Sequence, residues 1–345
     1  TAAEKGKRQL HYWVGTDNGR AVAFASGFSS LRRFNDAFSK RYGMPPTRLR
    51  RRATDHPAAM GNNETSTLQL SYRPPYDWQG VLAFLAARAL AGVEHVTSGS
   101  YARTVRLGDR GGMGASTGWI RVTQSSGHDA LLVEFTHGLT PALPALLSRV
   151  RALFDLDARP DVIAKRLRRD RRLAAAVKAN PGLRVPGAFN GFEMGVRAIL
   201  GQQVTVKSAT TIAGRFAAAF GEPIITPMPE LSRLTPAPSR IASATVDDIA
   251  RHGIIATRAK SIIALAAAQV SGEFTLDAGT HRDPDEAIRR LTELPGIGPW
   301  TAHYMAMRAL GWPDAFPAGD LVVMRSLGAK TPAQAREAAQ AWRPW

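Results

Sequence analysis

The stretch LPGIGPWTAHY at residues 294–304 contains the first residues whose type and spacing could do chemistry. Gly296 and Gly298 flank Ile297, and Pro299, a residue that suits the first turn of a helix, follows directly. A helix start exposes free backbone N–H groups and the positive end of the helix dipole, and glycines let a phosphate approach them closely. The pattern therefore predicts a phosphate-binding hairpin between two helices, although an ordinary turn that binds nothing fits the same residues.

Asp320, in the sequence FPAGD, is the candidate carboxylate. A carboxylate placed against a positive charge that develops during a reaction stabilises that charge and can help to activate water. Two alternatives remain at this point. Asp320 could simply cap the helix expected for LVVMRSLG, and Asp314, in WPDAF, is a rival carboxylate.

Two aromatic residues follow the glycines at helical spacing. Trp300 and Tyr304 lie four residues apart and hence on one face of the expected helix. An aromatic face attracts a cation by roughly 0.5–2 kcal/mol, so these rings are suited to hold a positively charged ligand. Packing in a core is the commoner role of any single aromatic residue.

Composition favours a polyanionic partner, most simply nucleic acid. The 345 residues carry a formal net charge of +17 and include no cysteine, which excludes disulfides, thiolate zinc sites and cysteine nucleophiles. The eight histidines are scattered, and neither a P-loop nor a dinucleotide-binding fingerprint is present. No apolar run approaches the roughly 20 residues that a membrane span needs, and the first residues, TAAEKGKRQL, lack the apolar stretch of a signal peptide, so we expect a cytoplasmic protein without membrane contact.

The elements that would position these residues fall into four regions. Residues 1–52 hold twelve Lys/Arg and three Asp/Glu, and residues 53–66 have the composition of a linker. Residues 67–155 are predicted to form a small α+β domain, and residues 156–345 to be nearly all helical. The predicted strands are 67–73, 93–107, 118–126 and 130–138, and the predicted helices include 77–90, 141–156, a pair joined at 201–203, a pair within 243–272, and 284–293 followed by 299–310.

The N-terminal region resembles part of an AraC-type helix-turn-helix, as in adaptive-response alkylation regulators. The matching words are ASGFSSLRRFNDAF and RYGMPPTRLRR, and Ser29 or Ser30 can cap the second helix. The resemblance implies that the helix around 29–41, with Arg32 and Arg33, enters the major groove. The preceding residues do not continue the pattern, so a remnant is expected, and a basic tail with only non-specific DNA affinity is the alternative.

Residues 67–345 resemble bacterial 3-methyladenine DNA glycosylase II, of the helix-hairpin-helix DNA glycosylases. The matching words keep their order and spacing: PPYDW, FLAARA, YAR, LFDL, GVRAILGQ, LPGIGPWTAHYMAMR and TPAQAR. The resemblance implies an α+β fold, with an antiparallel-sheet domain followed by an all-helical domain.

The same resemblance implies a role for each candidate residue. Asp320 becomes the catalytic carboxylate, and an aromatic pocket receives the base after it has been flipped out of the duplex. The pocket would consist of Trp300, Tyr304, Phe84 and Leu321, and the DNA contacts of Gly296, Ile297, Gly298 and Thr301, with Gln203 filling the hole left by the flipped base. Gln203 departs from relatives that carry an apolar side chain there, and a glutamine costs more to desolvate.

The expected activity is excision of alkylated bases from double-stranded DNA by a monomeric enzyme with no cofactor, apart from a possible monovalent cation on the hairpin carbonyls. Relatives that also cut the strand carry a lysine where this chain has Trp300, so no lyase step is expected. A regulator with an inactive glycosylase-like part is the alternative function. Because the family continues beyond AWRPW to another pocket tryptophan and the first residue is Thr1, we expect the sequence to be a fragment.

The charge of residues 1–52 generates a test. We expect DNA affinity to fall steeply with salt, and the log–log slope to become shallower when residues 1–52 are deleted, since each lost phosphate contact removes about 0.9 from the slope on duplex DNA. Fluorescence anisotropy over a salt series would measure both slopes. Equal slopes would mean that the segment does not touch DNA.

Overall fold

A computed structural model of the chain describes residues 30–42, 45, 64–108 and 115–345. Most of residues 1–52 and of the expected linker lie outside the described residues. Two compact units are present. One combines the described residues up to Tyr72 with Ala91–Arg151 and Pro223–Leu234, and the other combines Arg73–Leu90, Ala152–Glu222 and Thr235–Trp345.

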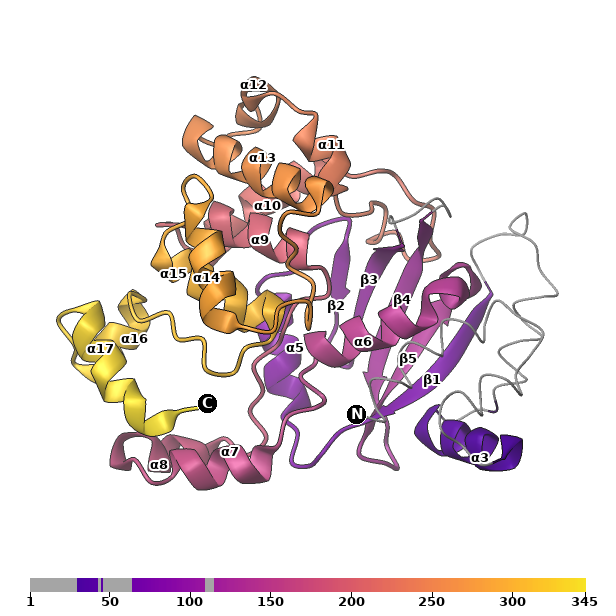
Figure 1. The fold of residues 1–345 in the computed structure, drawn as a ribbon. Coiled ribbons are helices and arrows are strands. Elements are labelled where there is room, and N and C mark those ends of the chain that lie inside the picture. Colours follow the sequence, from indigo (N-terminus) through magenta and orange to yellow (C-terminus); the bar gives the residue numbers. More distant parts are fainter. Residues whose placement is uncertain (1–29, 43–44, 46–63, 109–114) are drawn as a thin grey trace. The chain divides into compact units, whose positions relative to one another are not determined.

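The first unit is built on a five-stranded antiparallel sheet in the order β1-β5-β4-β3-β2 (Figure 1). In β1, Leu68 and Leu70 are both 1% exposed, which confirms the predicted alternation along this strand. The strands are β1 (Thr65–Ser71), β2 (Glu94–Val96), β3 (Ser100–Leu107), β4 (Ser116–Gln124) and β5 (Ala130–Thr136). After β5 come the 3-10 helix His137–Ala142 and α6 (Leu143–Leu153).

The single strand predicted over 93–107 is wrong. The chain reverses at residues 97–99, so that β2 pairs with β3 as a hairpin. Thr97 makes the turn locally, because its Oγ1 accepts hydrogen bonds from the backbone N–H groups of Gly99 and Ser100. The turn residues TSGS were present in the sequence and were the signal for this break.

Two segments pack away from their sequence neighbours. Pro223–Leu234 belongs to the sheet unit, where Leu231 packs with Ala102 and Trp119. The backbone oxygen of Arg233 accepts a 2.6 Å hydrogen bond from the Thr104 hydroxyl. Conversely, α5 (Trp78–Ala86) belongs to the helical unit.

The described residues of the N-terminal region form one helix. It is α3 (Leu31–Tyr42), and the backbone N–H of Arg33 donates to Ser30 Oγ, so Ser30 occupies the capping position. Arg32 and Arg33 are exposed, whereas Phe38 is 4% exposed. The remainder of the proposed helix-turn-helix lies outside the described residues.

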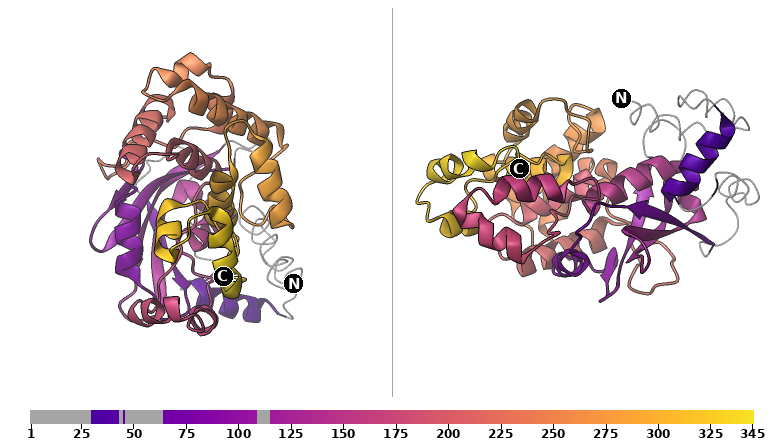
Figure 2. Two further views of the ribbon diagram at one scale, coloured as in Figure 1. Left: turned by 90° about the vertical axis from the view of Figure 1, so that its left-hand side faces the viewer. Right: turned by 90° about the horizontal axis from the view of Figure 1, so that it is seen from below.

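The helical unit contains α5 and the helices from α7 onward. Here α13 contacts α9, α11 and α12, and α15 contacts α9 and α14. Helix α16 contacts α17, and both are drawn in yellow in Figure 2. The bounds are α7 (Pro160–Leu167), α8 (Arg171–Ala179), α9 (Gly191–Leu200), α10 (Val206–Phe220), α11 (Pro238–Ala242), α12 (Val246–Ala250), α13 (Ala256–Ser271), α14 (Pro284–Glu293), α15 (Pro299–Met305), α16 (Leu321–Leu327) and α17 (Pro332–Ala339), with 3-10 turn Gln340–Trp342 last. The predicted pairs around 201–203 and within 243–272 are confirmed, and so is 284–293.

The helix predicted over 299–310 changes character halfway. After α15, residues Ala306–Leu310 form a π-helical segment that ends at Gly311, which has a φ of 71°. A π-helical turn carries an extra residue and redirects the side chains that follow it. In the ranges that the structure describes, none of the helices has both the length and the apolarity needed to cross a lipid bilayer.

Asp155 follows α6 with a left-handed backbone, at a φ of 49°. Burial raises the pKa of its carboxyl group to about 6, and the hydrogen bond from Val185 N lowers it only in part. The folded chain therefore retains this proton between about pH 4 and 6 while the unfolded chain releases it. The free energy of unfolding therefore falls as pH rises through that window, and the cost of burying the ionised carboxylate is fully present above pH 6.

We predict that Asp155→Asn stabilises the protein at pH 7.5, by at most about 3 kcal/mol for a shift of about two pKa units, and has little effect at pH 4. Asparagine tolerates the left-handed backbone and can still accept from Val185. Urea unfolding at both pH values would measure this. Glu230→Gln, at an exposed position, is the control, and a gain from Asp155→Asn that is equal at pH 4 and 7.5 would contradict the assignment.

Candidate active site

Asp320 lies at the N-terminus of α16 and is held by three hydrogen bonds. Its Oδ1 accepts from the backbone N–H groups of Val322 at 2.9 Å and Val323 at 3.1 Å, so the capping alternative is part of the structure. Its Oδ2 accepts from the indole Nε1 of Trp300 at 3.1 Å. The hydrogen bond from Trp300 joins the carboxylate to the aromatic residues of α15, at a sequence separation of twenty residues.

The two aromatic residues of α15 form a stacked pair. The ring centroids of Trp300 and Tyr304 are 5.3 Å apart and their planes differ by 9°. Both side chains are only partly buried, unlike the fully buried Ala302 and Met305 on the same helix. Partly exposed, parallel rings beside a carboxylate can stack against a planar base.

A buried arginine connects this pair to Phe84. Arg308, in the π-helical segment, is 6% exposed and donates from NH1 to Tyr304 Oη at 2.9 Å. Its guanidinium carbon lies 4.8 Å from the Phe84 ring centroid, and that of Arg88 lies 3.8 Å from the same centroid. The structure thus places Phe84, Tyr304 and Trp300 in one continuous cluster.

The buried charge of Arg308 is held by backbone oxygens. Its Nε donates to Pro186 O, and its NH2 donates to Gly187 O at 3.2 Å. Burial lowers the pKa of Arg308 from its usual value, as expected for a cation taken out of water. The segment Pro186–Gly187 and α15 are therefore tied together by one guanidinium.

The two hairpin positions occupied by glycine place different demands on the residue. Gly296 has a φ of 75°, and a Cβ there would lie 2.2 Å from Ser261 Oγ, so the fold itself requires glycine. At Gly298 a Cβ would meet no atom within 4 Å, and its φ of −84° is open to any residue. The glycine that the fold does not require is also the N-cap of α15, beside the helix's free N–H groups.

The other predicted DNA contacts lie around this hairpin. Ile297 and Thr301 are each 3% exposed, so they could meet DNA chiefly through their backbone. Gln203 is exposed and has a left-handed backbone with a φ of 55°, an uncommon conformation for a glutamine. Leu321, which was predicted for the base pocket, is 75% exposed and directly follows Asp320.

Arg32 and Arg33 belong to the other compact unit. Asp314, the rival carboxylate, is instead paired with Arg343 at 2.6 Å. Its partner is thus an exposed arginine rather than an aromatic ring.

Three residues of this site were missed in the sequence. Arg88 and Arg308 lie four residues after Phe84 and Tyr304, so helical spacing was the signal for both. Gln202 ties the 201–203 joint to the hairpin, because its Nε2 donates to Gly296 O at 2.9 Å and to Thr301 Oγ1 at 3.0 Å. The sequence held no comparable signal for this contact, which spans 94 residues.

Comparisons with known proteins identify relatives of both the sheet-containing and the helical part of the chain. Residues 67–190 match the AlkA N-terminal domain, and residues 196–342 match the HhH-GPD superfamily of base excision DNA repair proteins. The fold also resembles that of the 3-methyladenine DNA-glycosylase from Archaeoglobus fulgidus, with a TM-score of 0.66 at 21% identity over 79% of this chain and 91% of that chain.

Two relatives are similar over most of the chain. The protein "Probable bifunctional transcriptional activator/DNA repair enzyme AlkA" of Mycobacterium tuberculosis is 38% identical over 334 residues, which are 94% of this chain but only 64% of that protein's length. DNA-3-methyladenine glycosylase 2 of Escherichia coli strain K12 is 37% identical over 276 residues, covering 80% of this chain and 92% of that protein. The chain therefore belongs to the family of DNA-3-methyladenine glycosylase 2, within the HhH-GPD superfamily of base excision DNA repair proteins.

Proposed function

We propose that this chain flips alkylated bases of the 3-methyladenine class out of double-stranded DNA and excises them by hydrolysing the N-glycosidic bond. The observation that carries the proposal is the Asp320 carboxylate, fixed at the start of α16 and bonded to the indole of Trp300, whose ring is stacked on Tyr304. The name of the Escherichia coli relative supports the substrate class.

In the proposed reaction, the aromatic cluster and the carboxylate act on different parts of the substrate. An alkylated purine such as 3-methyladenine carries positive charge, so it stacks favourably on an electron-rich ring and leaves without much protonation. Asp320 stabilises the positive charge that develops on the sugar and helps to orient water. One carboxylate then suffices, because the leaving group needs little acid catalysis.

Binding of the duplex is assigned to the hairpin. The open space at Gly298 leaves room for a phosphate beside the free N–H groups of α15. Gln203 is suited to fill the gap left by the flipped base, since it is exposed and projects from the joint that Gln202 fastens to the hairpin. The hairpin's backbone carbonyls are of the type that holds a monovalent cation, and Leu294 O keeps a free lone pair after accepting from Ile297 N.

The N-terminal region is proposed to add affinity for DNA. Its exposed Arg32 and Arg33 on α3 are suited to phosphate contacts. A regulator with an inactive glycosylase-like part is not favoured, because the carboxylate and the rings proposed for the chemistry lie together. We propose that the enzyme acts as a monomer.

We predict that Asp320→Asn abolishes base release from alkylated DNA and leaves the affinity for abasic-site DNA within a few-fold. Asparagine is as good an N-cap as aspartate, so α16 should keep its start, while the charge that faces the sugar is lost. Release of 3-methyladenine from methylated DNA and anisotropy with abasic DNA would measure the two effects.

The matched control for this substitution is Asp314→Asn. It removes a carboxylate that is paired with Arg343 and should leave base release unchanged. Full activity of Asp320→Asn would contradict the catalytic assignment, and loss of base release in Asp314→Asn alone would transfer it to Asp314.

We predict that no lyase step accompanies excision. Trp300 stands where strand-cutting relatives carry a lysine, and an indole cannot form a Schiff base with the abasic sugar. Treatment of the reacting enzyme with borohydride should yield no covalent protein–DNA complex, and the abasic product should remain uncut until alkali is added. A trapped complex from the unmodified protein would refute the proposal of a monofunctional enzyme.

A further inference from the structure

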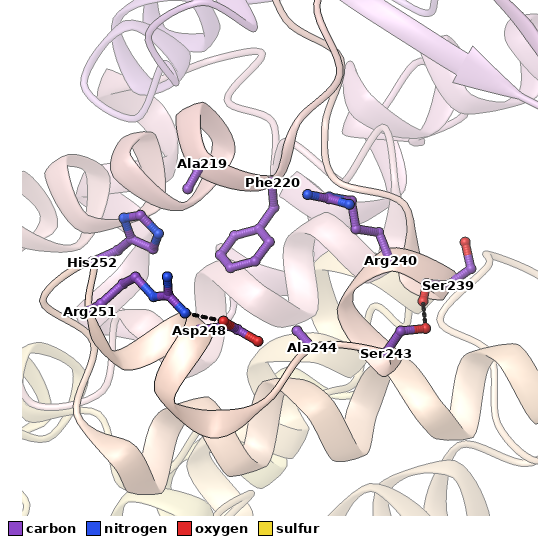
Figure 3. Close-up of a pocket in the computed structure, with 9 residues that line it drawn as sticks. All are labelled: Ala219, Phe220, Ser239, Arg240, Ser243, Ala244, Asp248, Arg251 and His252. Carbon is purple, nitrogen blue, oxygen red and sulfur yellow. Dashed lines mark hydrogen bonds and ion pairs between the residues drawn. The ribbon is translucent and has the colours of Figure 1, made fainter.

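A cavity of about 660 Å³ lies where the end of α10 meets α11 and α12, and it shares no residue with the cluster around Asp320 (Figure 3). Its volume is within the roughly 300–1,000 Å³ range of sites that hold small ligands. The cavity is lined by Ala219, Phe220, Ser239, Arg240, Ser243, Ala244, Asp248, Arg251 and His252.

The lining carries an excess of positive charge. Arg251 pairs with Asp248, so these two charges offset each other. Hydrogen bonds from the Thr245 side chain and backbone hold the pKa of Asp248 below its usual value, which keeps this acid ionised. Within the part of the chain that the structure describes, Arg240 has no hydrogen-bond or ion-pair partner, and it is exposed. One guanidinium therefore faces the cavity uncompensated, which suits an anion.

The same cavity has an aromatic wall. The rings of Phe220 and His252 meet edge to face, with centroids 5.6 Å apart, and Phe220 lies between His252 and Arg240 (Figure 3). The Ser243 hydroxyl donates to the backbone oxygen of Ser239 at 3.0 Å, so it can only accept a further hydrogen bond. The Ser239 hydroxyl is available as a donor. A phosphate attached to a planar ring system would meet a guanidinium, a hydroxyl and an aromatic surface.

We propose that this cavity is a second binding site, which takes a single nucleotide unit with its phosphate at Arg240 and its base against Phe220 and His252. The nucleotide has two possible sources, a free mononucleotide or one nucleotide of a DNA strand bound by the same protein. The proposal does not depend on the proposed glycosylase activity, because binding is measured without base release.

The test is a calorimetric titration of the full chain with 2′-deoxyadenosine monophosphate. We expect saturable binding that competes with inorganic phosphate and weakens about tenfold or more in Arg240→Gln. Arg282→Gln, which removes an equally exposed arginine outside the cavity, should bind as the unmodified protein does. Ser239→Asp should also weaken binding, since it adds a negative charge to the cavity in the first turn of α11, a position where an acid does not disfavour the helix.

Duplex DNA distinguishes the two sources. If Arg240→Gln weakens duplex binding more than Arg282→Gln does, the cavity takes a nucleotide of the bound strand; if the two variants bind duplex equally, it takes the free nucleotide. The proposal is overturned if the unmodified protein does not bind the mononucleotide, if Arg240→Gln binds it unchanged, or if binding is lost in Trp300→Ala instead, which would place the ligand in the aromatic cluster.

Discussion

The arrangement of the aromatic cluster depends on one buried cation, the guanidinium of Arg308. A charge taken out of water is costly unless hydrogen bonds replace its hydration, and here Pro186 O, Gly187 O and Tyr304 Oη accept them. Movement of any of these three acceptors would leave a buried N–H group of the Arg308 guanidinium without a hydrogen bond. Because the same guanidinium also lies over the Phe84 ring, the positions of α5, α15 and the Pro186–Gly187 segment are set together. Arg308 itself lies in the π-helical turn and is among the buried residues of that turn.

The hairpin at residues 296–298 is also held in place by side chains, which contact it at Gly296. Ser261 on α13 fills the space that a side chain at Gly296 would need, and Gln202 spans from Gly296 O to the Thr301 hydroxyl. These contacts use the inner side of the turn and leave Gly298 without neighbours. A backbone turn that is rigid on one side and open on the other presents its N–H groups without reorganisation, which is the condition for binding a phosphate tightly.

Local patterns in the sequence predicted the helices and strands. Contacts between segments far apart in the chain could not be predicted from the sequence. The alternation of Leu68 and Leu70 and the helical spacing of Ala287 and Leu291 gave β1 and α14, because burial of one face imposes a period on each. The sequence motifs singled out Asp320, Trp300 and Tyr304 as candidates, and the structure brings these three side chains together. By contrast, the packing of Pro223–Leu234 in the sheet unit, and the acceptors of Arg308 more than 120 residues away, depend on chain segments whose meeting leaves no periodic trace.

The observed helix-cap role of Asp320 and the catalytic role that we propose for it do not exclude each other in this fold. Helix α16 has no buried residue, so little packing holds it, and a short helix of that kind relies on its cap. Oδ1 accepts hydrogen bonds from two backbone N–H groups, and these bonds fix the plane of the carboxylate. In that plane, Oδ2 points at the Trp300 indole. The hydrogen bonds that start the helix thus orient the acid against the aromatic cluster. The chemistry that we propose for Asp320 needs an immobile charge, and a helix N-terminus supplies the immobility through the backbone rather than through bulky neighbours that would exclude a substrate.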